Sequence, residues 1–161
     1  VTGIVTATTL IVGTAVTTSS GKVGLGTGVP RSDIDLDGST RFKTYHESVG
    51  VVTSASNVVT LDLSSAQTFT LTVDEQVNSF KLTNPPSGST AFTVKILQDS
   101  TGYSVGIDTF NDNGGSAIPV YWPAAVTPDV TTTASKTDIY SFMTFDSGSS
   151  LYGVVGGQNF A

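Results

Sequence analysis

The residues of this chain that could do chemistry are mostly carboxylates. Asp33, Asp35 and Asp37 alternate with apolar residues and precede a glycine, which is the opening of a calcium loop of the form D-x-D-x-D-G. That loop needs a bidentate glutamate at its twelfth position, and this chain has a threonine there. We therefore expect a strand that turns Ile34 and Leu36 inward and the three carboxylates outward, with no resident metal. Repeated around a symmetry axis, the three carboxylates remain candidates for attracting a cation.

A serine motif and two acidic pairs are the candidates for catalysis. Gly102–Gly106 (GYSVG) matches the G-x-S-x-G nucleophile elbow, which requires a turn from a strand into a helix. A Gly/Asn-rich loop follows here instead, and His46 is the only histidine. We expect a strand that begins at the motif's first glycine and no catalytic role for its serine.

The acidic pairs are Asp108 with Asp112 and Asp74 with Glu75, and a glycosidase uses two such carboxyl groups. Neither pair lies in a segment that predicts a cleft. The sequence therefore predicts no catalytic residues.

The strongest candidate for binding is a loop predicted over residues 108–117. Sugar-binding proteins stack aromatic rings on sugar rings and bind hydroxyl groups with amides and carboxylates. Phe110, Asn111, Asp112 and Asn113 bring these types together. We expect these four residues to contact a receptor.

The composition excludes several classes of function. The 161 residues carry a formal net charge of -6 and include no cysteine and one histidine. Disulfides, thiolate nucleophiles and Cys-based metal sites are therefore excluded, and we expect no cofactor. Residues 46–161 hold three lysines against ten acidic residues, a balance that repels phosphate backbones, so we expect no nucleic-acid partner. Threonine and glycine interrupt the apolar run Val1–Val16, so we expect no membrane insertion.

The elements that must position these residues are strands. Threonine and valine favour the half-buried surface of a sheet, and no segment predicts a helix longer than one turn. Turn signals at 84–88, 111–115 and 146–149 separate the strands. Their spacing predicts an antiparallel β-sandwich, jelly-roll-like, with Trp122 in its core. Period-two alternation marks the segments Val58–Leu63, Thr68–Val73, Phe92–Ile96, Tyr103–Ile107 and Ile139–Phe145, and Leu151–Val155 is predicted to form a last strand.

The chain divides near residue 45. Residues 1–45 contain too little apolar volume to form a core alone. A flexible linker is less favoured, because Gly/Ser linkers carry few β-branched residues. We expect residues 1–45 to form a short β shaft by packing against copies of themselves, and residues 46–161 to form a C-terminal β-sandwich domain. Because the sequence starts at Val1, we expect it to be part of a longer protein.

Two stretches resemble a known class of protein. Val23–Gly38 (VGLGTGVPRSDIDLDG) resembles the V-G-I-G-T-x-x-P-x-x-K-L-x-V-x-G segment of phage tail fibres and other trimeric fibrous proteins, with Asp33 where the pattern has lysine. Thr2–Thr8 is similar to repeats in fibre-like proteins of marine cyanophages, and residues 68–160 resemble the C-terminal module of virion structural proteins from the same phages. The resemblance implies a homotrimer with an intertwined β shaft that leads into a knob.

Three functions follow as expectations. The first is a non-enzymatic fibre protein of the virion, whose knob caps the fibre or attaches to a glycan or protein of the host surface. The second is a decoration protein of the capsid, neck or tail that contacts other virion proteins without binding a receptor. The third and least favoured is a polysaccharide depolymerase.

Overall fold

The computed structural model describes residues 16–19, 22–25, 34–36, 39 and 41–161. It divides into two units, residues 1–45 and residues 46–161. In the first unit, β1 (Val16–Ser19) pairs antiparallel with β2 (Lys22–Leu25), and β2 pairs parallel with β3 (Ile34–Leu36). The strand expected over residues 34–36 is therefore present.

The described side chains of the first unit form no core within one chain. Gly24 is the one buried residue among them, and Ile34 is 66% exposed. Within the single chain the Ile34 side chain is therefore mostly exposed, whereas we expected it to face inward in a shaft made of several copies. Asp33 and Asp37 lie outside the described residues. Asp35 is described only as a backbone position of β3.

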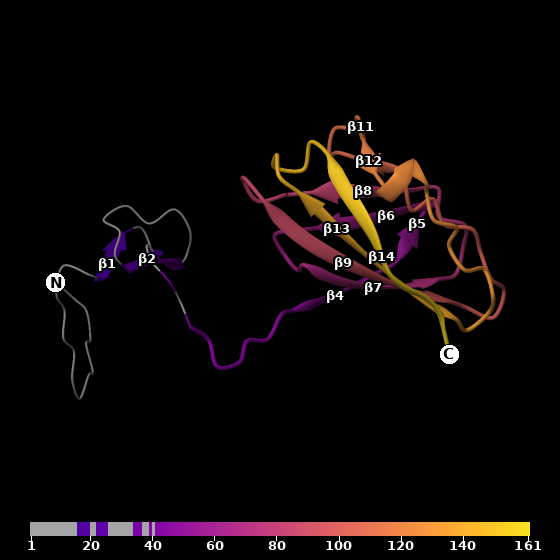
Figure 1. Ribbon diagram of the computed structural model, residues 1–161, viewed down its shortest axis with the longest axis horizontal. Coiled ribbons are helices and arrows are strands. Elements are labelled where there is room, and N and C mark those ends of the chain that lie inside the picture. Colours follow the sequence, from indigo (N-terminus) through magenta and orange to yellow (C-terminus); the bar gives the residue numbers. More distant parts are fainter. Residues whose placement is uncertain (1–15, 20–21, 26–33, 37–38, 40) are drawn as a thin grey trace. The chain divides into compact units, whose positions relative to one another are not determined.

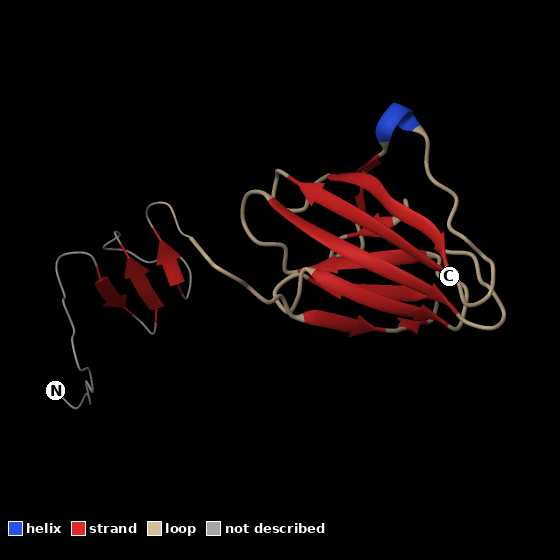
Figure 2. Ribbon diagram, turned by 60° about the horizontal axis from the view of Figure 1, so that its bottom comes forward, coloured by secondary structure: helices blue, strands red, loops and turns tan. Residues whose placement is uncertain are grey.

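The second unit consists of two mixed sheets (Figures 1 and 2). The smaller sheet has the strand order β11-β10-β8-β6-β5, and the larger has the order β12-β14-β13-β9-β7-β4. The smaller contains β5 (Ser54–Ala55), β6 (Val58–Asp62), β8 (Ser79–Thr83), β10 (Phe110–Asn111) and β11 (Ala117–Ile118). The larger contains β4 (Val49–Val52), β7 (Thr68–Val73), β9 (Thr90–Gln98), β12 (Val120–Tyr121), β13 (Thr137–Thr144) and β14 (Leu151–Phe160).

The expectation of an antiparallel, jelly-roll-like sandwich is wrong in its strand pairing. From β6 to β9 the chain passes from one sheet to the other at every turn. Each passage reverses the chain, so strands two apart in sequence become parallel neighbours, as β6 and β8 are in one sheet and β7 and β9 in the other. Jelly rolls are built from antiparallel strands. Hairpins remain at β5–β6, β10–β11 and β13–β14.

The core lies between the two sheets, and the alternation read from the sequence identifies its members. Phe69, Leu71 and Val73 of β7 are buried, as are Tyr140 and Phe142 of β13. Aromatic rings join the sheets, because the Phe110 ring of β10 lies 5.1 Å from that of Phe80 in its own sheet and 4.9 Å from that of Phe142 in the other. Such ring pairs add to the free energy gained by burying their surface.

Trp122 is buried in this core, as expected, and its ring makes edge contacts with Tyr140 and Phe142. The segment Tyr103–Ile107 differs from its prediction, because it is a loop with a single bridge between Val105 and Val77. The helical content of the described residues is one 3-10 turn, η1 (Pro123–Ala125), and nothing in this part of the chain is a helix long and apolar enough to cross a membrane.

Two buried polar side chains tie the long loop before β13 to the sandwich. Asp138 accepts hydrogen bonds from the N–H groups of Thr131 (2.7 Å) and Asn159 (2.8 Å) and from the Tyr140 hydroxyl (3.1 Å). Gln98 donates from Nε2 to the carbonyl of Thr131 (2.8 Å). The loop and the end of β14 are therefore held by satisfied buried groups.

Candidate functional site

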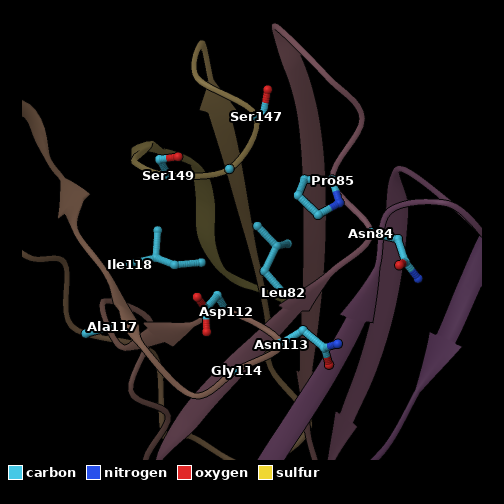
Figure 3. A pocket seen from close by; sticks show the side chains of 11 residues that line it. Leu82, Asn84, Pro85, Asp112, Asn113, Gly114, Ala117, Ile118, Ser147 and Ser149 are labelled. Carbon is cyan, nitrogen blue, oxygen red and sulfur yellow. The ribbon is translucent and has the colours of Figure 1, made fainter.

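Three turns at one end of the second unit enclose an open cleft of about 450 Å³. They follow β8, join β10 to β11 and join β13 to β14. Figure 3 shows Leu82 and Ile118 in the middle of the cleft, with Pro85 on one side and Ala117 on the other. The lining residues are Leu82, Asn84, Pro85, Asp112, Asn113, Gly114, Ala117, Ile118, Ser147, Gly148 and Ser149.

One wall of the cleft is fixed by contacts between the turn that follows β8 and the turn that joins β13 to β14. The Ser147 amide donates to the Gly88 carbonyl at 3.0 Å, and the Gly88 amide donates to Ser147 Oγ at 2.9 Å. Gly148 has a φ of +86°, and a Cβ there would lie 2.9 Å from the Pro85 side chain. Glycine is therefore required for the turn to approach Pro85 this closely.

Asp146 organises the turn between β13 and β14 from within. Its carboxylate accepts hydrogen bonds from the Ser150 hydroxyl (2.6 Å), the Thr144 hydroxyl (2.8 Å) and the Ser150 amide (3.0 Å). These bonds, the Ser150 hydroxyl first, lower the pKa of Asp146 from its ordinary value. The carboxylate is thus a structural acceptor, and Ser147 and Ser149, which follow it in the turn, are placed at the cleft.

The wall at Asn84 has a similar support. Asn84 has a φ of +50°, a conformation that asparagine adopts more readily than most residues, and its Nδ2 donates to Asp62 at 3.0 Å. This bond is the main cause of the lowered pKa of Asp62. The Asn84 side chain is therefore held at the rim by its neighbour.

The polar side chains of the cleft that are least engaged in hydrogen bonds within the protein belong to the 112–116 turn. Asp112 Oδ1 accepts from the Ser116 amide at 2.8 Å, which closes the turn. Asp112 and Asn113 are exposed, and within the described residues no hydrogen bond involves the Asn113 amide. A second hollow on the other side of the turn shares Asp112 and Asn113 and adds Asn111 and Lys81.

Two of the four residues predicted to contact a receptor, Asp112 and Asn113, line the cleft, and a third, Asn111, lines the second hollow. Phe110 is a correction, because its side chain is 1% exposed and lies inside the aromatic core. Alternation places it inward while its neighbour Asn111 turns outward. The serines and the proline of the opposite walls were missed as site residues, although their segments were identified as turns.

The cleft can bind a polar ligand through several kinds of group. It has an apolar floor and a rim of amides, hydroxyls and one carboxylate, the combination that suits an uncharged, hydroxyl-rich molecule. The predicted acidic pairs are not assembled in it: Asp108 lines a separate hollow with Asp129, and Glu75 accepts hydrogen bonds from Ser54 Oγ (2.5 Å) and the Asn57 amide (3.0 Å).

The serine motif also lacks the surroundings that catalysis would need, whereas the side chains of the cation candidates Asp33, Asp35 and Asp37 lie outside the described residues. Ser104 is exposed in a loop and is followed by further loop and a short strand. Among the described residues, no group of three or more histidine, aspartate or glutamate side chains is arranged to hold a metal ion. No family model, no curated protein and no solved structure matches this chain.

Proposed function

We propose that this chain is a non-enzymatic structural protein of a phage fibre, located in the virion and assembled as a homotrimer. In this proposal residues 1–45 belong to an intertwined β shaft, and residues 46–161 form the knob. The knob attaches to a hydroxyl-rich glycan of the host surface through the cleft. The resemblance of Val23–Gly38 to fibre segments supports the class, and the cleft supports the mode of attachment.

The single observation that carries the attachment is the state of the cleft's polar groups. Ser147 and Asp146 are engaged in holding their turn, whereas Asp112 and Asn113 are exposed, and Oδ1 of Asp112 accepts the bond that closes its turn. Polar groups that are positioned by locked turns, beside the apolar floor of a cleft, lose little conformational entropy when they bind.

The shaft is supported by the burial of the first unit. Its described side chains are exposed or half-buried apart from Gly24, and Phe42 and Tyr45 are exposed. A sheet with so little burial needs partners, and three-fold closure supplies them while removing free strand edges.

The test is the binding of the full chain to an array of bacterial surface polysaccharides. Asp112→Asn combined with Asn113→Ala keeps the acceptor that closes the turn, and Ala117→Trp fills the cleft. We expect each to weaken binding at least about tenfold, the equivalent of about 1.4 kcal/mol. Asp74→Asn, an exposed carboxylate away from the cleft, is the matched control.

Unchanged binding by both cleft variants would remove the cleft from the proposal. Binding to virions without binding to any polysaccharide would favour the decoration protein. Release of soluble sugar from the array would favour the depolymerase.

A further inference from the structure

The exposed apolar side chains of the second unit are gathered on one sheet. Every exposed large apolar residue of the unit, apart from Val126, lies on a strand of the larger sheet or directly follows one. None belongs to the smaller sheet. They are Val49, Val51, Tyr121, Met143, Phe145, Tyr152, Val154, Val155 and Phe160.

Three of these residues form a connected aromatic group. The Tyr152 ring of β14 lies 5.3 Å from the ring of Tyr121 and 5.7 Å from that of Phe145. All three remain 44–63% exposed. They pack on one another and not on the core, and contiguous exposed apolar surface of this kind marks an interaction site.

The same sheet carries almost no charge. Its six strands contain two charged residues, Lys95 and the buried Asp138. The unit's other acidic residues lie in the turns and loops or, like Asp62, in the smaller sheet. With three lysines and ten acidic residues, two copies of the unit repel one another. The outer face of the larger sheet is where such copies can approach with the least repulsion.

Both edges of the larger sheet are also open. β4 pairs only with β7, and Val51 on it is 82% exposed. β14 pairs with β12 only at Leu151 and Tyr152, so among the described residues no strand covers its outer edge beyond them. Open edges with apolar side chains pair with other chains unless something covers them.

We propose that the outer face of the larger sheet, centred on Met143, Tyr152 and Val154, is the surface through which copies of this chain associate. Low charge on an acidic molecule, exposed apolar side chains and open edges coincide on this one sheet. The face offers valine and methionine side chains and aromatic rings that pack on one another, and these features suit an apolar protein surface. The inference rests on the proposed self-assembly and adds, to the shaft of residues 1–45, a surface of the second unit that takes part in it.

The absence of cysteine from the chain makes the test direct. Val154→Cys places one thiol on the proposed face, and Thr60→Cys places one on the exposed outer side of the smaller sheet. The rate of maleimide labelling is measured on each full-length variant, folded and in denaturant, and the mass of each is measured by light scattering. We expect a mass of several chains and folded-state labelling of Val154→Cys at least about tenfold slower than that of Thr60→Cys.

Tyr152→Lys gives an independent reading, because it places a charge on the face, and Thr60→Lys is its control. We expect Tyr152→Lys to lower the mean mass and Thr60→Lys to leave it unchanged. Equal labelling of both thiols in a multi-chain particle would overturn the inference and leave self-assembly standing. A one-chain mass with rapid labelling would overturn both. A one-chain mass with slow labelling at Val154→Cys would overturn the inference, since the chain's own residues would then cover the face.

Discussion

Replacing Asp138 with asparagine removes a negative charge that donors from three segments share. Asp138 is 1% exposed, and its two oxygens accept from Thr131, Tyr140 and Asn159. Asparagine has the same shape but only one acceptor atom. Whichever way its amide turns, an NH₂ group faces a backbone N–H, of Thr131 or of Asn159.

The expected loss of stability follows from these bonds. A buried backbone N–H without a partner costs about 1–3 kcal/mol, and the remaining bonds lose the extra strength that the charge gives them. We expect Asp138→Asn to lower the free energy of unfolding by about 3 kcal/mol. For a unit of this size that corresponds to a fall in Tm of about 10 °C.

The effect of Asp138 should also depend on pH. Burial raises the pKa of Asp138, but the hydrogen bonds from Asn159, Thr131 and Tyr140 outweigh it, so the pKa lies below its ordinary value. A group with a lowered pKa contributes stability that is fully present above its unfolded pKa, about 3.9, and is lost as the pH falls through the folded pKa. The difference between the native chain and Asp138→Asn should therefore stay constant from about pH 5 upward and shrink below about pH 4.

The assay is urea unfolding followed by tryptophan fluorescence, since Trp122 is the only tryptophan and contacts Tyr140. Asp74→Asn removes the same charge from an exposed position and is the control. A loss under about 1 kcal/mol for Asp138→Asn, or a loss equal to that of the control, would refute the reasoning. If the difference in the free energy of unfolding between the native chain and Asp138→Asn grew as the pH fell, the pKa of Asp138 would be raised and not lowered, which would contradict the reasoning.

Four further substitutions test the packing and one turn by urea unfolding. Gly153→Ala should cost about 1–3 kcal/mol, because its Cβ would lie 2.6 Å from the Trp122 ring, and an unchanged midpoint would contradict this contact. Phe110→Ala should lower the free energy of unfolding by about 3–5 kcal/mol, as expected of a core aromatic residue. A loss near zero would show that the Phe110 side chain lies at the surface. Ser147→Ala should cost about 1 kcal/mol by removing the acceptor of the Gly88 amide, and Ser149→Ala should cost less because Ser149 bonds only within its own turn.

Local alternation made most of the strands predictable from the sequence. The strand predicted at Thr68–Val73 has the bounds of β7, and the burial of Tyr140 and Phe142 follows their period of two. The pairing was not predictable, because alternation does not say which sheet receives the next strand. The turns from β6 to β9 cross between sheets, and the turn after β8 carries the same Gly, Pro and Asn signals that hairpins carry.

The candidate site was predictable in part for a related reason. Asn111, Asp112 and Asn113 stand out as a polar loop, and they do line hollows. The opposite walls come from turns about 30 residues away on either side along the chain, at Pro85 and Ser147, and only the three-dimensional fold brings them near. The apolar outer face was not predicted, because Met143, Tyr152 and Val154 follow the same period-two alternation as core residues. The alternation alone does not distinguish an exposed apolar face from a buried one.

The mass of the intact chain in solution tests the central claim most directly, because a fibre protein of this kind must self-assemble. Light scattering on a size-exclusion column measures it without reference to shape. The account predicts three times the mass of the 16.6 kDa chain, unchanged on moderate dilution. A mass of one chain at every concentration would contradict the shaft, the fibre and the association of the apolar faces together.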